Sequence, residues 1–160
     1  MKPRVGIGYD IHRLSEGRPL YLGGILIPHD RGLLGHSDGD SLIHAVIDAL
    51  SGAAGFPDIG VRFPPGDEAF KDIRSTLLLE EVSGDLREGK WAIANIDAVV
   101  IAEKPRITPY VPDMKQALAS ILGMPDSAIS IKATTNEGLG AIGQGEAIAA
   151  WAVALVHDMR

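Results

Sequence analysis

The chain has 160 residues, and 46% of them are hydrophobic, which suits one domain with a sizeable core. No apolar run reaches the roughly 18 residues of a membrane-spanning helix, and a formal net charge of −6 argues against nucleic-acid binding. Cysteine is absent, which excludes disulfides and thiolate metal sites, and we expect a cytoplasmic protein without a signal peptide.

Residues 5–12 predict a strand. Apolar residues at positions 5, 7, 9 and 11 alternate with small or polar residues, which is the period of a half-buried strand. Asp10 and His12 therefore project from the same face. After this strand we expect a polar connection at 13–19, a hairpin over 20–27 with a Gly-Gly turn, and a loop at 28–34.

Residues 37–50 predict the start of a helix, which we expect to end near Gly52 to Gly55. The stretch opens with turn and capping residues and continues with apolar residues at 42, 46 and 50, which form one stripe. His44 and Asp48 fall together on the opposite side. We expect Asp48 to orient the His44 ring, as carboxylates often do for metal-binding histidines.

Asp10, His12 and His44 together offer one oxygen and two nitrogen ligands. Three protein ligands leave the fourth tetrahedral position open, as in catalytic zinc sites. Either fragment alone is more often an exposed histidine–carboxylate pair, but the two together indicate a zinc site.

The rest of the chain predicts loops, helices and strands of ordinary length. We expect a turn at 56–60, a loop at 63–67, a helix over 69–88, a strand over 91–103, a helix over 109–122 and a strand over 129–133. Segment 146–157 is ambiguous, because its alanines favour a helix whereas its alternating large residues favour a strand.

Glu137 follows a strand and a pair of threonines. Hydroxyls and backbone amides at a strand-to-helix turn are suited to phosphate, yet a glutamate beside them would repel it. A cation between the two, Mg²⁺ or Mn²⁺, would remove the conflict. The alternative is that Glu137 is an ordinary helix-start residue favoured by the helix dipole.

Four motifs, in their order and spacing, resemble the 2-C-methyl-D-erythritol 2,4-cyclodiphosphate synthase family. They are Gly8–Leu14, Gly35–His44, Asp58–Pro64 and Lys132–Gly140, and the resemblance covers nearly the whole chain. It implies an α+β fold: a single domain over 1–160 with a mixed β-sheet and helices packed on one face, and a strand at 146–157. It also implies a homotrimer with the sheets around the threefold axis.

The activity implied by the resemblance is a metal-dependent cyclisation. The substrate would be 4-diphosphocytidyl-2-C-methyl-D-erythritol 2-phosphate, whose 2-phosphate attacks the β-phosphorus and releases CMP, a step in non-mevalonate isoprenoid biosynthesis. One Zn²⁺ per subunit and a Mg²⁺ or Mn²⁺ on the diphosphate would be the cofactors, and active sites would lie between subunits.

The resemblance also assigns residues. His36 and Thr135 would stabilise the transition state, Asp58 and Gly60 would hold the ribose, the loop at 63–67 would cover the substrate, and 102–107 would recognise cytosine. The full substrate-binding set is Asp10, His12, His36, Ser37, Asp58, Ile59, Gly60, Phe63, Asp67, Ala102, Lys104, Pro105, Arg106, Ile107, Thr134, Thr135, Asn136 and Glu137.

The sequence departs from the family's common pattern at Pro65, Arg74, Ala141 and Gln144. Pro65, with Gly66, puts the detail of the substrate loop in question, and Arg74 stands where an aspartate is usual. Ala141 and Gln144 replace an aromatic residue and an arginine, which predicts weak binding of isoprenoid diphosphates at the threefold axis.

The residues alone are also compatible with two other classes of protein. A zinc-dependent phosphohydrolase acting on a nucleotide diphosphate would use the same ligands with water as the nucleophile. A non-catalytic trimeric nucleotide-binding protein would keep the cytidine segment and lose the metal. The presence of all three zinc ligands ranks this second alternative last.

Overall fold

The computed structural model describes residues 2–160, which form a five-stranded sheet with helices on one face. The strand order is β4-β1-β7-β5-β6, in which β5 and β6 run parallel and the other neighbours run antiparallel. The strands are β1 (Lys2–Glu16), β4 (Arg31–Leu34), β5 (Trp91–Ile101), β6 (Ile129–Thr134) and β7 (Ala147–Asp158). The expected single α+β domain with a mixed sheet is confirmed.

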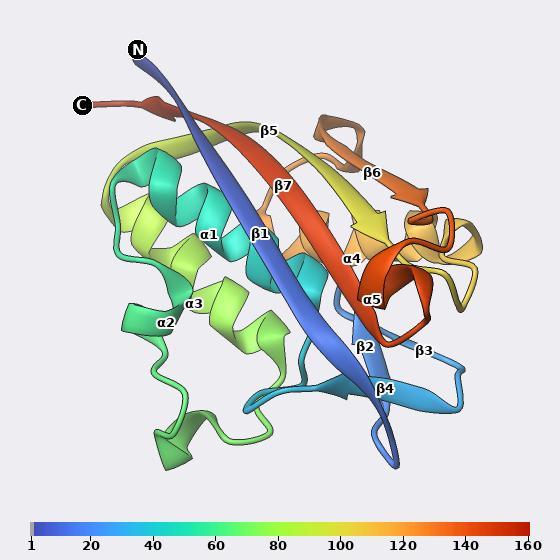
Figure 1. Cartoon of the computed structure of the whole chain (residues 1–160). Coiled ribbons are helices and arrows are strands. Elements are labelled where there is room, and N and C mark those ends of the chain that lie inside the picture. Colours follow the sequence, from blue (N-terminus) through green and yellow to red (C-terminus); the bar gives the residue numbers. More distant parts are fainter. Residues whose placement is uncertain (1) are drawn as a thin grey trace.

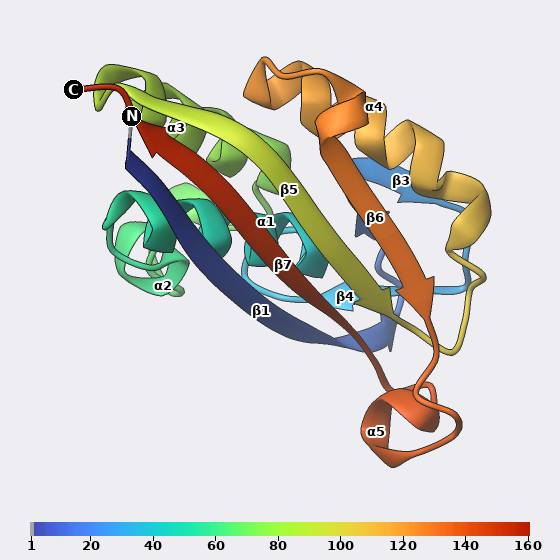
Figure 2. The ribbon, with the colours of Figure 1, turned by 90° about the horizontal axis from the view of Figure 1, so that it is seen from above.

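Three long helices cover one face of this sheet (Figures 1 and 2). They are α1 (Ser41–Ala54), α3 (Ser75–Glu88) and α4 (Val111–Leu122). Two four-residue helices, α2 (Ile59–Arg62) and α5 (Gly140–Gly143), and single 3-10 turns at Glu68–Phe70, Thr108–Tyr110 and Asp126–Ala128 lie in the connections. No helix among residues 2–160 has the length and apolar character to cross a membrane.

The hairpin of β2 (Leu20–Leu22) and β3 (Ile25–Ile27) is a separate two-stranded sheet. Its turn residues Gly23 and Gly24 have φ of 61° and 81°, as a two-residue hairpin turn requires. Both turn amides donate to the buried carboxylate of Asp40, at 2.9 and 2.8 Å, and this carboxylate also caps α1 by accepting from the Ile43 amide. Asp40 thus fixes the start of α1 against the hairpin. Burial, with the nearby charge of Asp38, raises the pKa of Asp40 despite these three N–H donors.

Strand β1 packs directly on α1 because two glycines face the helix. A Cβ on Gly6 would lie 1.9 Å from the Ala49 carbonyl oxygen, and a Cβ on Gly8 would lie 1.9 Å from that of Ala45. Side chains at these positions would therefore force the strand and the helix apart. This contact sets the distance between the next residues of the glycine face, Asp10 and His12, and the helix.

The apolar residues of β1 face away from the helices, on the uncovered side of the sheet. Val5 and Ile7 are 66% and 63% exposed, and Tyr9 and Ile11 continue the row. On the neighbouring strand β7, Trp151 and Val153 are also exposed, and the Trp151 ring contacts Tyr9 at a centroid distance of 4.6 Å. One chain alone leaves this contiguous apolar face without a cover.

Several predicted boundaries are wrong. The expected connection at 13–19 begins with four residues of β1, which pair with β4 inside the expected loop at 28–34. The expected turn at 56–60 leads into α2, capped by Asp58. Strand 146–157, expected from the resemblance, is confirmed as β7.

The expected helix over 69–88 begins only at Ser75. Residues before it pair with the segment that precedes α1: the Asp72 amide donates to the His36 carbonyl at 2.7 Å, and the Asp38 amide donates to the Ile73 carbonyl at 3.0 Å. Asp72 also has a φ of 55°, which a continuous helix does not allow. These long-range hydrogen bonds hold residues 71–74 outside the helix.

Candidate functional site

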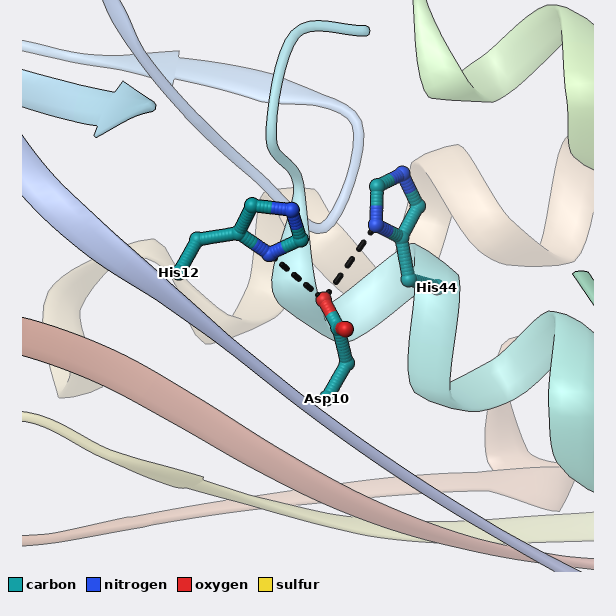
Figure 3. A group of neighbouring side chains, drawn as sticks. All are labelled: Asp10, His12 and His44. Carbon is teal, nitrogen blue, oxygen red and sulfur yellow. Dashed lines mark hydrogen bonds and ion pairs between the residues drawn. The ribbon is translucent and has the colours of Figure 1, made fainter. Parts of the chain in front are cut away.

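Asp10, His12 and His44 converge at the junction of β1 and α1 (Figure 3). Their ligand atoms all lie within 4.8 Å of one another. Nδ1 of His12 lies 2.7 Å from Oδ2 of Asp10, and Nδ1 of His44 lies 3.2 Å from the same oxygen. The predicted ligand set is therefore assembled within one chain, with two nitrogens directed at one carboxylate oxygen.

The electrostatics of Asp10 and His44 are coupled. Burial alone would raise the pKa of Asp10, but its hydrogen bond with His44, its close contact with the His12 ring and the charges of both rings outweigh burial, and the pKa is lowered. Burial alone would lower the pKa of His44, but the hydrogen bond to Asp10 and the charges of Asp10, Asp40 and Asp38 raise it. Without a metal ion, the site therefore favours an imidazolium paired with a carboxylate.

The residues fit a divalent cation. Nδ1 of His12 is close to Asp10 but is not aligned for a hydrogen bond, and it is buried without a hydrogen-bond partner. A buried ring nitrogen without a partner is costly unless something binds its lone pair. One carboxylate and two imidazoles are a donor set typical of zinc.

The second nitrogen of His44 contacts serine hydroxyls. Nε2 lies 2.8 Å from Oγ of Ser75 and 3.2 Å from Oγ of Ser37. The expectation that Asp48 orients this ring is wrong, because Oδ1 of Asp48 accepts from the Ile59 amide at 2.8 Å. Burial raises the pKa of Asp48, and the hydrogen bond from Ile59 opposes this shift. Asp48 therefore holds the start of α2.

The three ligands open into a cavity of about 190 Å³. Its lining includes eight of the predicted site residues, together with Pro65 of the predicted substrate loop and two residues that were not predicted, Phe70 and Leu78. The eight are Asp10, His12, His36, Ser37, His44, Ile59, Gly60 and Phe63. Asp58 lies beside this cavity as the cap of α2, where its Oδ1 accepts from the Val61 amide at 3.0 Å.

His36 reaches across the cavity mouth to the loop that was expected to cover the substrate. Its Nε2 donates to the Asp67 carbonyl at 2.7 Å. Arg18 fixes the backbone of the segment that carries His36, because its guanidinium donates to the carbonyls of Leu33 and Ser37 at 2.9 and 2.8 Å. Sequence reasoning missed Arg18, which acts across 15 and 19 residues of chain.

A second cavity, of about 370 Å³, lies at the ends of β5 and β6. Six predicted substrate-binding residues line it, as does Glu103 of the predicted cytosine segment; Thr108 and Ala133, which also line it, were not predicted. The six are Ala102, Pro105, Arg106, Ile107, Thr134 and Thr135. Lys104, Asn136 and Glu137 are neighbours in the chain but do not line it.

The turn that carries Glu137 is held by Glu103, and this role was not predicted. Oε1 of Glu103 accepts from the Asn136 amide at 2.8 Å and from the Gly138 amide at 3.5 Å. The Glu137 amide donates to the Thr135 hydroxyl at 3.2 Å, and Glu137 itself has a φ of 53°. The backbone donors expected to meet phosphate are thus engaged within the turn in this structure.

The two cavities share no lining residue. His12 lies opposite Ile148 on β7, and Ile101, at the end of β5, lies opposite the next residue, Ala149. Both cavities are therefore at the same end of the sheet. Strands β7 and β5 lie between β1 and β6, however, a separation of about 14 Å for three strand spacings.

Two of the departures from the family pattern have a visible role. The Arg74 guanidinium lies 3.9 Å from the Tyr21 ring centroid and donates to Gly24 and Asp38. The side-chain Nε2 of Gln144 donates to the Gly138 carbonyl at 3.1 Å, so it stabilises the loop of Glu137. Ala141 lines a surface hollow of about 220 Å³ beside Arg13.

Known proteins match this chain over nearly its whole length. Residues 3–157 match the model of the YgbB family. The 2-C-methyl-D-erythritol 2,4-cyclodiphosphate synthase of Syntrophomonas wolfei is 52% identical, covering 97% of this chain and 99% of that protein. The protein of the same name from Synechococcus sp. (strain JA-2-3B'a(2-13)) is 54% identical over the same shares.

A solved structure described as a CDP complex of IspF from Plasmodium falciparum superposes with a TM-score of 0.86 at 34% identity, covering 99% of this chain and 97% of that chain. Sequence and fold thus agree over nearly the full length. The chain belongs to the YgbB family, the family of the 2-C-methyl-D-erythritol 2,4-cyclodiphosphate synthases.

Proposed function

We propose that this chain converts 4-diphosphocytidyl-2-C-methyl-D-erythritol 2-phosphate into 2-C-methyl-D-erythritol 2,4-cyclodiphosphate and CMP. The observation that carries the proposal is the convergence of Asp10, His12 and His44 on a cavity in a member of this family. In the reaction an oxygen of the 2-phosphate bonds to the β-phosphorus. The bond from that phosphorus to the oxygen bridging it to the α-phosphate breaks, and CMP leaves with its electron pair.

The nucleophile belongs to the substrate, so the protein has to align two phosphates and balance their charge. Zn²⁺ on Asp10, His12 and His44, and Mg²⁺ or Mn²⁺ near Glu137, would supply Lewis-acid stabilisation of the phosphate oxygens. This charge neutralisation has to be local, because the net charge of the chain is −6.

The remaining residues bind and orient the substrate. Segment 102–107, of which all residues but Lys104 line the second cavity, would hold the cytosine, while Asp58 and Gly60, at the first cavity, would hold the ribose. His36 and Thr135 would donate to the phosphates as charge moves between them. The His36 ring already has its Nε2–H directed at a carbonyl oxygen, so the substrate would replace the Asp67 carbonyl as its acceptor.

We propose a homotrimer with active sites between neighbouring subunits. Two observations support it: the uncovered apolar face of β1 and β7, and the two separate cavities. The α- and β-phosphates of one diphosphate are adjacent, whereas the first cavity lies at β1 and α1 and the second lies at the end of β6, three strand spacings from β1. A neighbouring copy would bring its second cavity to the first cavity of this chain.

Phosphorus NMR of the product tests the reaction. The protein is incubated with the cytidyl substrate, Zn²⁺ and Mg²⁺, and the spectrum is recorded as CMP appears. We expect the two coupled resonances of a cyclic diphosphate in a one-to-one ratio with CMP. Two uncoupled phosphomonoester resonances, from the linear 2,4-bisphosphate that water attack would leave beside CMP, or free phosphate, would instead identify a phosphohydrolase and refute the proposal.

A further inference from the structure

Asp38, just before α1, has a carboxylate surrounded by hydrogen-bond donors. Oδ1 accepts from the Asp40 amide at 3.1 Å and from the Ser75 hydroxyl at 2.5 Å. Oδ2 accepts from the Ser75 amide at 2.9 Å and from Nε of Arg74 at 3.3 Å. Both oxygens are thus occupied by donors, and an ionised carboxylate, which only accepts, satisfies all four of them.

This arrangement fixes the direction of the Ser75 hydroxyl. A hydroxyl has one proton to donate, and Ser75 gives it to Asp38. The hydroxyl oxygen can then act only as an acceptor toward its other close neighbour, Nε2 of His44, at 2.8 Å. The Ser37 hydroxyl also faces Nε2 but lies farther away, at 3.2 Å, so the shorter contact with Ser75 decides the position of the proton and places it on Nε2.

A neutral imidazole has one N–H, so a proton on Nε2 leaves the lone pair of Nδ1 free. Nδ1 of His44 is the nitrogen directed at Asp10, at 3.2 Å. We propose that Asp38 and Ser75 form a positioning pair that selects the Nε2–H tautomer of His44 and so directs Nδ1 to the metal ion. This inference rests on the metal site of the proposed function.

The pair also links the metal site to the fold. Arg74, the residue at the cap position of α3, makes no capping hydrogen bond, and the carboxylate of Asp38 bonds the first amide of the helix instead. The same carboxylate therefore places α3 and, through the Ser75 hydroxyl, the His44 ring. Metal-binding histidines usually have such an acceptor on the second nitrogen, and its loss typically weakens metal binding.

The first test is the zinc affinity of the full-length protein, measured by competition with a chromophoric chelator. Ser75→Ala removes the hydroxyl and keeps the backbone hydrogen bond to Asp38. We expect the Kd for Zn²⁺ to rise about 10- to 100-fold. Ser83→Ala is the matched control, because Ser83 is also a buried serine of α3 but donates to the Ile121 carbonyl at 3.2 Å, away from the site. The control should stay within about twofold of the parent chain.

The second test reports the tautomer itself. Nitrogen-15 NMR of the histidine rings is recorded on the metal-stripped full-length chain, at a pH where the rings are neutral. We expect Nε2–H for His44 in the parent chain and in Ser83→Ala, and a mixture of tautomers in Ser75→Ala. Asp38→Asn, whose amide can donate to the Ser75 hydroxyl, should shift His44 toward Nδ1–H.

Three results would count against the inference. An unchanged tautomer and unchanged zinc affinity in Ser75→Ala would overturn it, and so would an equal loss of zinc affinity in Ser83→Ala. If the parent chain itself failed to bind Zn²⁺, the metal site of the proposed function would be refuted as well. Zinc binding by the parent chain distinguishes the two failures.

Discussion

Replacing Gly8 with alanine should damage the fold and the metal site together. The added Cβ would lie 1.9 Å from the Ala45 carbonyl oxygen, whereas ordinary van der Waals contact begins at 3.4 Å. Strand and helix would therefore have to separate by about 1.5 Å, since neither backbone can turn aside. Overpacking of this kind costs about 1–3 kcal/mol, and a contact between two backbones belongs at the upper end.

The same displacement would separate the metal ligands, because Asp10 and His12 lie on β1 and His44 lies on α1. Metal–ligand distances tolerate deviations of about 0.2 Å, far less than the expected shift. Gly8→Ala should therefore lower the midpoint of urea unfolding and also weaken zinc binding by more than tenfold. Both are measured on the purified chain, by circular dichroism and by chelator competition.

Gly84→Ala is the control for this experiment. Gly84 is an α3 glycine with no heavy atom within 4 Å of an added Cβ. Alanine there should raise stability by about 0.5–1 kcal/mol, because glycine is the poorer helix former. If Gly8→Ala unfolded like the parent chain and bound zinc equally well, the close packing of β1 on α1 would not be what positions the ligands.

Three further predictions concern the site and the uncovered face. Asp10→Asn should lose zinc and activity while keeping its circular dichroism, because the buried helix stripe of α1 is unchanged; retention of stoichiometric zinc and full turnover would exclude this ligand. Zinc affinity should fall as the pH drops below the raised pKa of His44, by up to about tenfold per pH unit, because one proton must leave the ring before Nδ1 can bind the metal. Calorimetric titration with Zn²⁺ in buffers of different ionisation enthalpy measures the number of protons released. Ile7→Asp should dissociate the trimer in light scattering, whereas Leu26→Asp, at an equally exposed position on the hairpin, should not; an intact Ile7→Asp trimer would place the interface elsewhere.

The sequence predicted correctly those helices and turns that are determined by residues close to one another in the chain. Helix α1 has its apolar stripe and its cap within fourteen residues, and the Gly-Gly hairpin has both turn residues at positive φ. Asp10 and His12 could be placed on one face because the period of a strand alone decides it. The same period does not say which face is covered, and here the glycine side, not the apolar side, meets α1.

The errors arose where a distant residue decides the outcome. Helix α3 begins at Ser75 because Asp38, 37 positions earlier, accepts its amide, and no signal near residue 75 indicates this. Helical periodicity grouped Asp48 with His44, but it could not show that the Ile59 amide would bind Asp48. Ser75 itself gave no signal, because a serine in the first turn of a helix is common and its partner, His44, lies 31 residues away.

The separation of the two cavities leads to a test of where the active site lies. If each site combines the zinc ligands of one subunit with Glu137 of the next, two inactive variants should complement each other. His44→Ala lacks the first half and Glu137→Ala lacks the second, so each homotrimer should be inactive. Mixed trimers would contain some sites built from the intact half of each.

The expected recovery follows from counting. In trimers refolded from an equal mixture, a site is intact when its zinc half comes from Glu137→Ala and its other half from His44→Ala, which occurs in about a quarter of sites with random assembly. Activity should therefore recover to about a quarter of the parent value, and should not recover when each variant is refolded alone. A site confined to one chain predicts no recovery in the mixture. Failure to complement, with mixed trimers demonstrated by mass spectrometry, would refute a site shared between neighbouring subunits.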